Sequence, residues 1–161
     1  YKHIRKMSTG HPATRNNKTH EVIETKMIPK VDIKVRGYHL DEIGHVNNAR
    51  YLEFLEEARW AIFDNKLGLE EFLKEGFAFT VVNINISYRR PAYLHDILTV
   101  ETNLAKLGNK SATLHQLVKK SNSGEAVAEA DVTFVMLDIN KQKAALLAGP
   151  LKDKLISVMD T

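Results

Sequence analysis

The stretch from residue 35 to residue 64, VRGYHLDEIGHVNNARYLEFLEEARWAIFD, constrains the fold more than any other part of the chain. Its second half has the apolar spacing i, i+4, i+7 and i+11 of one face of an α-helix: Tyr51, Leu55, Ala58 and Ile62. Leu52 and Phe54 widen this stripe, and the acidic residues take the opposite side. A helix that is apolar over more than half of its circumference needs another layer wrapped around it.

A polar turn before this helix holds the residues best suited to chemistry, which are Asp41, Gly44, His45, Asn47 and Asn48. Asn47 or Asn48 can cap the helix by accepting hydrogen bonds from N–H groups of the first turn. The turn therefore lies at the positive end of the helix dipole. An acid such as Asp41 at this place can act as a general base or as a nucleophile on a carbonyl carbon. It can equally be a residue that only caps the turn.

The rest of the chain predicts an antiparallel sheet with short connections. We expect strands at residues 28–38, 79–90, 97–107, 111–120 and 126–138, a second helix at residues 69–75 that Gly76 ends, and a tail at residues 141–161 with room for a short terminal helix. One strand, a long helix and four further strands predict an α+β domain in which the sheet packs on the helix.

Two strand faces are unusual. In strand 79–90 the apolar side chains of Val82, Ile84, Ile86 and Tyr88 alternate with a polar row of Asn83, Asn85, Ser87 and Arg89. The polar row fits a solvated surface and a contact with a second copy of the chain equally well. In strand 126–138 one face carries small residues at positions 126, 128 and 130. Because a single copy of such a sheet has open edges, these faces could pair with a second copy.

The motif GYHLDEIGHVNNARYLEFLEEAR, followed by NINISYRRPAYLHD, resembles the hotdog-fold acyl-CoA thioesterases of the 4-hydroxybenzoyl-CoA thioesterase superfamily. The resemblance extends from about residue 33 to the C-terminus and is strongest to the FadM-type long-chain enzymes. It implies a hotdog fold, with a five-stranded antiparallel sheet wrapped around one long central helix. It also implies hydrolysis of medium- to long-chain acyl-CoA to fatty acid and coenzyme A, without a metal or other cofactor, in a homodimer or homotetramer with sites at subunit interfaces.

The resemblance also implies roles for individual residues. Asp41 takes the position of the catalytic acid, the backbone N–H of Asn48 that of the oxyanion donor, and His45 and Asn47 orient the reacting groups. For the acyl chain we expect apolar side chains of the helix and the following strand: Tyr51, Phe54, Leu55 and Val82. For the phosphates of coenzyme A the candidates are Arg89, Arg90, Lys110 and Ser111, since arginine holds phosphate in a bidentate fork. Each of these charges could also be an ordinary solvated strand end.

Three other interpretations of the same residues stay open. His39, Asp41 and His45 have N and O ligands that would suit zinc, although short His and Asp spacings arise easily by chance. A hotdog acyl-CoA hydratase would use Asp41 and His45 together to add water to a double bond. A non-catalytic acyl-binding module would bind acyl-CoA without turnover.

Composition bounds the remaining possibilities. Residues 1–26 hold six basic and two acidic residues and lack any periodicity, so we predict that they are a disordered leader or an upstream extension outside the fold, with one domain at residues 27–161. The other 135 residues hold 17 basic and 18 acidic groups, so the folded part is not basic. The high pI is therefore no evidence for a nucleic-acid partner. There is no cysteine and no apolar run of membrane-spanning length, and we predict a cytoplasmic location.

Overall fold

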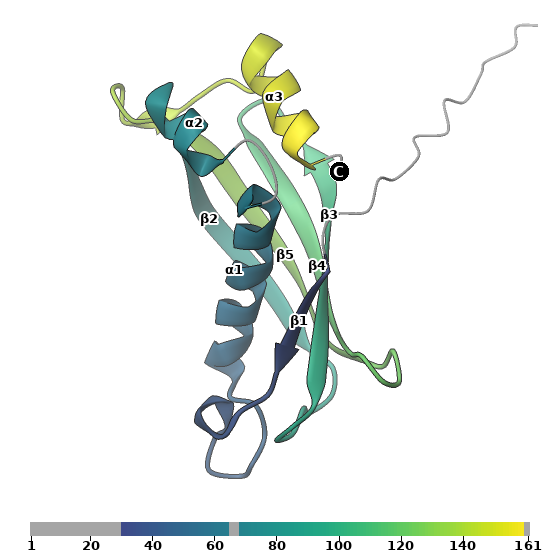
Figure 1. Ribbon diagram of the computed structural model, residues 1–161. Coiled ribbons are helices and arrows are strands. Elements are labelled where there is room, and N and C mark those ends of the chain that lie inside the picture. Colours follow the sequence, from purple (N-terminus) through teal and green to yellow (C-terminus); the bar gives the residue numbers. More distant parts are fainter. Residues whose placement is uncertain (1–29, 65–67, 160–161) are drawn as a thin grey trace, which may run out of the picture.

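Figure 1 shows the computed structural model, in which a long helix lies across one face of a curled antiparallel sheet. The structure describes residues 30–64 and 68–159, so the predicted leader at residues 1–26 lies outside the described residues. The elements in chain order are β1 (Val31–Lys34), α1 (Asn48–Asp64), α2 (Leu69–Lys74), β2 (Phe77–Tyr88), β3 (Ile97–Leu107), β4 (Ser111–Lys120), β5 (Ala126–Asp138), β6 (Lys143–Ala144) and α3 (Gly149–Met159).

The sheet has the strand order β1-β3-β4-β5-β2, and all of these pairs are antiparallel. The predicted bounds of β3, β4 and β5 are confirmed, and the short β6 adds to the end of β5. The α+β hotdog arrangement of five strands around one long helix is also confirmed. One edge of the sheet is β1, with four residues, and the other is β2, with twelve. The long open edge is therefore at β2.

The first strand is shorter than the sequence predicts. The strand ends at Lys34, and a 3-10 helix, Gly37–His39, begins where the sequence predicts that residues 37 and 38 continue it. The reason is local hydrogen bonding, because the Nδ1 atom of His39 accepts a bond of 3.0 Å from the Arg36 N–H and so satisfies a donor that a strand would have paired. The imidazole is 7% exposed and stacks edge-on against Phe54, with 5.0 Å between ring centroids.

This buried imidazole should make the fold sensitive to acid. Burial lowers the pKa of His39, as do the charges of Arg50 and Arg36, while Glu53 raises it. Because the folded-state pKa is below that of the unfolded chain, the stabilising contribution is complete above the unfolded value and is lost as the pH falls through the folded value. We expect the His39→Asn variant to be destabilised at about pH 7.5 and less so at about pH 5, as measured by urea unfolding. An equal difference at both pH values would contradict this.

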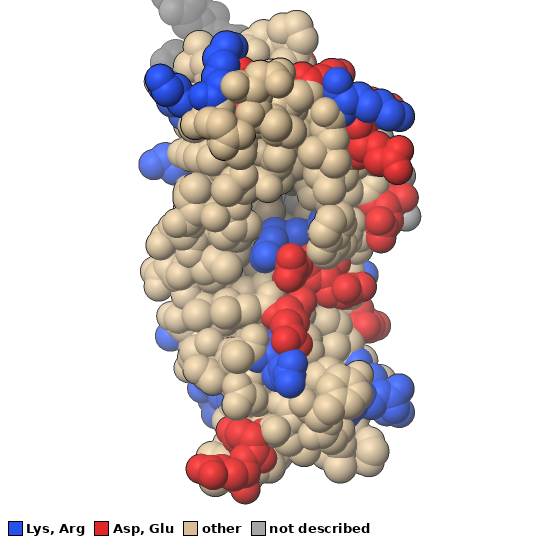
Figure 2. Space-filling view, turned by 90° about the vertical axis from the view of Figure 1, so that its left-hand side faces the viewer, with Lys and Arg blue, Asp and Glu red and all other residues tan. Residues whose placement is uncertain are grey.

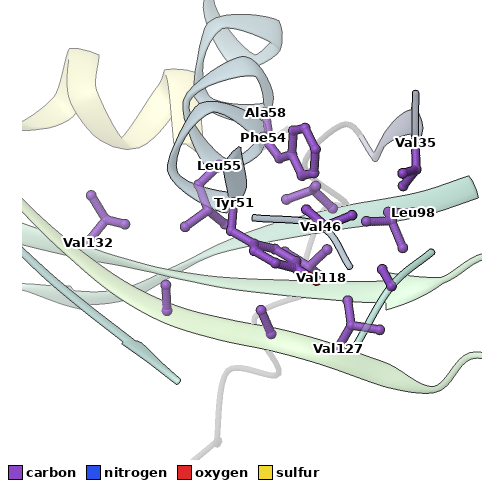
Figure 3. Close-up of a cluster of buried hydrophobic side chains, with 14 residues drawn as sticks. Val35, Val46, Tyr51, Phe54, Leu55, Ala58, Leu98, Val118, Val127 and Val132 are labelled. Carbon is purple, nitrogen blue, oxygen red and sulfur yellow. The ribbon is translucent and has the colours of Figure 1, made fainter. Parts of the chain in front are cut away.

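The first half of α1 packs on the sheet through the apolar stripe. Figure 3 shows Tyr51, Phe54, Leu55 and Ala58 of the helix above Val118, Val127 and Val132 of the sheet. Ala128 and Ala130 are buried in the same cluster. The prediction that this small-residue face contacts a second copy is therefore wrong. Leu52 is 39% exposed, so it does not widen the buried stripe.

The second half of α1 belongs to a separate cluster. Ile62 packs there with Phe72 of α2 and with Leu155, Val158 and Met159 of α3. The segment predicted to be a tail thus supplies an eleven-residue helix to the core. Its amphipathic pattern is short, which explains why spacing alone indicated only a short helix there.

A β-bulge divides β2 between these clusters. The register with β5 skips Val82, because Val81 pairs with Phe134 and Asn83 pairs with Thr133. As a result Phe77 and Phe79 pack in the second cluster, and Ile84 and Ile86 pack against the first. The predicted alternation holds after the bulge, where the amide-bearing residues are exposed.

Candidate active site

Asp41 organises the turn that leads into α1. Its Oδ1 atom accepts hydrogen bonds of 3.1 Å from the N–H groups of Ile43 and His45, and Gly44 between them has a positive φ of 80°. The carboxylate thus caps its own turn through one oxygen. No hydrogen bond to Oδ2 is present in the described part of the chain, so this oxygen is available to a water or a substrate.

The start of α1 leaves a backbone donor beside that turn. Asn47 caps the helix, since its Oδ1 atom accepts a bond of 2.9 Å from the Ala49 N–H. The Asn47 N–H itself donates to the carbonyl oxygen of His39 at 2.9 Å. The N–H of Asn48, the first helical residue, has no acceptor among the described residues, as expected for a first-turn donor. It lies at the end of the helix that favours negative charge.

Asp41 and Asn48 both line one open cleft of about 420 Å³. Its lining residues come from the turn, the start of α1 and the end of β2: Asp41, His45, Val46, Asn48, Tyr51, Tyr88, Arg89, Arg90 and Pro91. The hydroxyl of Tyr88 donates to the carbonyl oxygen of Asn48 at 3.0 Å and so ties β2 to the helix start. Burial raises the pKa of Tyr51 to about 12, so it stays a neutral wall of the cleft.

The side chains of His45 and Asn47 make no hydrogen bond to the carboxylate of Asp41 in the described part of the chain. The ring of His45 stacks edge-on against Tyr93, with 5.1 Å between centroids, and makes no hydrogen bond to Asp41 among the described residues. Asn47 is a helix cap and does not line the cleft. No group of three residues able to hold a metal occurs in the parts of the chain that the structure covers, so His39, Asp41 and His45 do not converge on one point.

The residues predicted to bind the phosphates of coenzyme A lie at two opposite ends of the molecule. Arg89 pairs with Glu129, and Arg90 pairs with Glu125 at 2.9 Å, both at the cleft. Lys110 instead lines an open hollow near the start of β2 and the C-terminal segment, and Ser111 begins β4 beside it. Within one chain, therefore, Lys110 and Ser111 are not brought together with the two arginines.

The apolar candidates for the acyl chain take three different positions: Tyr51 lines the cleft, Phe54 and Leu55 lie in the core, and Val82 is exposed on β2. Phe54 and Leu55 are 4% and 0% exposed, and Val82 is 57% exposed, lies in the bulge of β2 and does not line the cleft. A separate cavity of about 180 Å³ lies at the other end of α1. Its walls are mostly aromatic and aliphatic, with two charged residues: Glu56, Arg59, Trp60, Ile62, Phe63, Leu69, Leu73, Ala78, Phe79, Val81, Leu114, Phe134 and Met159.

Sequence reasoning missed this cavity and the part that Tyr88 plays in the cleft. A signal was present in both cases. Trp60 is a large aromatic residue outside the predicted apolar stripe of the helix, and Tyr88 ends the apolar face of its strand directly before the two arginines.

Comparison with known proteins decides the family. The model of the thioesterase-like superfamily matches residues 35–155. The chain belongs to this superfamily. The long-chain acyl-CoA thioesterase FadM of Escherichia coli is 52% identical over 126 residues, which cover 78% of this chain and 96% of FadM.

Solved structures agree with this assignment. The crystal structure of YbaW from Escherichia coli is 50% identical and superimposes with a TM-score of 0.77 over 82% of this chain and 98% of YbaW. A thioesterase from Thermus thermophilus, solved with coenzyme A and Zn, is 29% identical, with a TM-score of 0.69 over 84% of this chain and 98% of that one. None of the described helices combines the length and hydrophobicity needed to span a bilayer.

Proposed function

We propose that this superfamily member is an acyl-CoA thioesterase that hydrolyses medium- to long-chain acyl-CoA. Water adds to the thioester carbonyl, the C–S bond breaks, and the products are a fatty acid and the thiol of coenzyme A. The observation that carries the proposal is that Asp41 and Asn48 line one cleft and that the Asn48 N–H has no acceptor in the described part of the chain. The activity named for the 52% identical relative supports the substrate class.

The chemistry follows from the two groups. The Asn48 N–H would donate to the carbonyl oxygen as it becomes an oxyanion, a type of contact whose loss costs about 3 to 4 kcal/mol of transition-state stabilisation elsewhere. Asp41 would take a proton from the attacking water, or would attack the carbonyl itself to give a mixed anhydride that water then cleaves. In both routes the fixed Oδ1 atom orients the carboxylate and leaves Oδ2 to react.

The test is release of free thiol from a chain-length series of saturated acyl-CoAs. We expect turnover that rises toward the longer chains. A hydratase would instead remove the absorbance of an enoyl-CoA without releasing thiol, and a binding module would retain acyl-CoA without turnover. Either result would overturn the proposal.

The arginines at the cleft give a prediction about binding. Their present partners are partly exposed glutamates, and ion pairs near the surface contribute only about 0 to 1 kcal/mol, so phosphate can replace them. Charge-assisted hydrogen bonds to phosphate are stronger, at about 1.5 to 3 kcal/mol. We expect the double variant Arg89→Met, Arg90→Met to raise KM for acyl-CoA roughly 5- to 30-fold.

The control substrate is the S-acyl pantetheine, which has no phosphate and should keep its KM in this variant. The control variant is Lys110→Met at the opposite end of the chain. Equal effects of Lys110→Met and of the arginine double variant would contradict the assignment of the arginines.

Assembly into at least a homodimer is part of the same proposal. The twelve-residue β2 is an edge strand, and Val81 and Val82 on it are 43% and 57% exposed, which favours pairing with a second copy. A dimeric mass in sedimentation at micromolar concentration is expected, and a monomeric mass would contradict it. The choice between dimer and tetramer and the cytoplasmic location stay predictions from the sequence.

A further inference from the structure

One face of α1 joins the cleft to the cavity at the other end of the helix. Asn48, Leu52, Glu56 and Trp60 follow one another at i+4 spacing along this face, and all four are exposed. Leu52 and Trp60 are apolar, and β2 runs beside the helix with Tyr88 at the cleft end and Val81 at the cavity end. This exposed, partly apolar row of side chains therefore runs from the helix start, at the cleft, to the cavity.

The length of this row fits the tail of a long acyl chain. Arg59 lies eleven residues after Asn48, which is about 16 Å along the helix axis. A thioester held at the Asn48 N–H would send an extended long chain over this distance, with its far end at the cavity. At about 180 Å³ the cavity is smaller than the roughly 300 to 1,000 Å³ of a typical site for a whole ligand, so it suits the end of a chain.

Arg59 makes this cavity unlike a plain hydrocarbon pocket. Its Nη1 atom donates to Oε1 of Gln116 at 2.9 Å, and Gln116 in turn donates to Thr102 and to the Leu55 carbonyl. Gln116 is 0% exposed, so the guanidinium is held from behind by a rigid, fully hydrogen-bonded network.

The positive charge of Arg59 is only weakly balanced by nearby carboxylates. No carboxylate lies within 4.0 Å of it in the described ranges, although Glu56 lines the same cavity. Burial lowers the pKa of Arg59, which means that the charged form loses solvation there. Figure 2 shows basic atoms inside a hollow near the middle of this face, beside a group of acidic side chains. A half-buried guanidinium with free donors in an apolar cavity favours a ligand that brings an oxygen atom.

We propose that the cavity binds the distal end of the acyl chain and that Arg59 donates a hydrogen bond to an oxygen on that end. The preferred substrates are then long acyl-CoAs with a terminal hydroxyl or carboxylate. This inference rests on the proposed thioesterase function. Arg59 is a specificity-determining residue in it and takes no part in the hydrolysis.

The experiment compares palmitoyl-CoA with its ω-hydroxy and ω-carboxy derivatives. For the wild type we expect kcat/KM to be about 10- to 100-fold higher for the better of the two oxygenated substrates, the range of one charge-assisted hydrogen bond. Arg59→Met should remove this preference while it retains hydrolysis of palmitoyl-CoA. Arg59→Lys, which keeps the charge without the planar fork, should restore part of it.

Two controls keep the outcomes distinct. Arg50→Met removes an exposed arginine of the same helix that pairs with Glu53, and it should leave the preference unchanged. Inhibition of the wild type by the free ω-hydroxy and ω-carboxy fatty acids, compared with palmitic acid, repeats the test without a mutation, in case Arg59→Met fails to fold. Oxygenated acids are expected to inhibit more strongly.

The outcomes separate this inference from the function on which it rests. If the wild type hydrolyses all three substrates equally, the inference is overturned and the thioesterase function stands. If no substrate releases thiol, the function itself fails. If Arg59→Met changes the sedimentation coefficient and not the substrate preference, a second copy covers the cavity and the inference is wrong.

Discussion

The Asp41→Asn variant should fold normally and lose about 10²- to 10⁴-fold in kcat/KM for acyl-CoA, the usual contribution of a positioned base. The amide oxygen can still accept the two backbone hydrogen bonds that Oδ1 accepts from Ile43 and His45. The side chain therefore keeps its place in the turn. What it loses is the ability to take a proton or to attack a carbonyl carbon. Thiol release measures the loss, and thermal unfolding checks the fold.

Glu42→Gln is the matched control for this experiment. Glu42 is the neighbouring acid, it is exposed, and its substitution makes the same change in net charge. It should leave kcat/KM unchanged. If Asp41 serves only as a turn cap, Asp41→Asn will retain full activity and only Asp41→Ala, which removes the acceptor, will lower the stability.

Phe72→Ala should lower the free energy of unfolding by about 3 to 5 kcal/mol, the cost of removing a buried aromatic ring. Phe72 is 0% exposed and anchors the six-residue helix α2 to the core. Its ring stacks edge-on against Phe79 at 5.0 Å, and the Lys154 ammonium lies 4.7 Å from its centre. Without the ring, α2 loses its one fully buried side chain. Urea unfolding provides the measurement.

Leu73→Ala is the control, because it truncates the next residue of the same helix. Leu73 is 46% exposed, and we expect a loss of about 1 kcal/mol or less. Similar losses for the two variants would show that α2 is held by its own helical structure rather than by the buried ring.

The regular parts of the fold could be predicted because each has one clear periodicity. The stripe of Tyr51, Leu55, Ala58 and Ile62 is buried as its spacing indicated. The strands β3 to β5 have the predicted bounds, since turn residues separate them. Asp41 and Asn48 do share a cleft, because both belong to one short turn whose geometry is local.

The irregular parts could not be predicted from spacing. Val81 and Val82 are both apolar, so the bulge between them leaves no mark on the alternation of the strand. The 3-10 helix depends on a bond from the Arg36 backbone to the His39 ring, which no propensity encodes.

The separation of Lys110 from the cleft follows from the strand order. Both β4 and β2 pair antiparallel with β5, so the start of one lies at the opposite end from the close of the other. Spacing along the chain does not specify which strands are neighbours, and so it could not show this.

The β-bulge at Val82 determines how far the effect of a substitution in β2 can spread. Each half of β2 meets the helix layer with its own set of side chains, and no inward residue serves both halves. Substitutions that reshape the compartment around Phe79 can therefore be absorbed there, without displacing the ladder that fixes Tyr88 against the helix start. The cavity around Phe79 can therefore change in shape while the cleft at Asp41 and Asn48 stays the same.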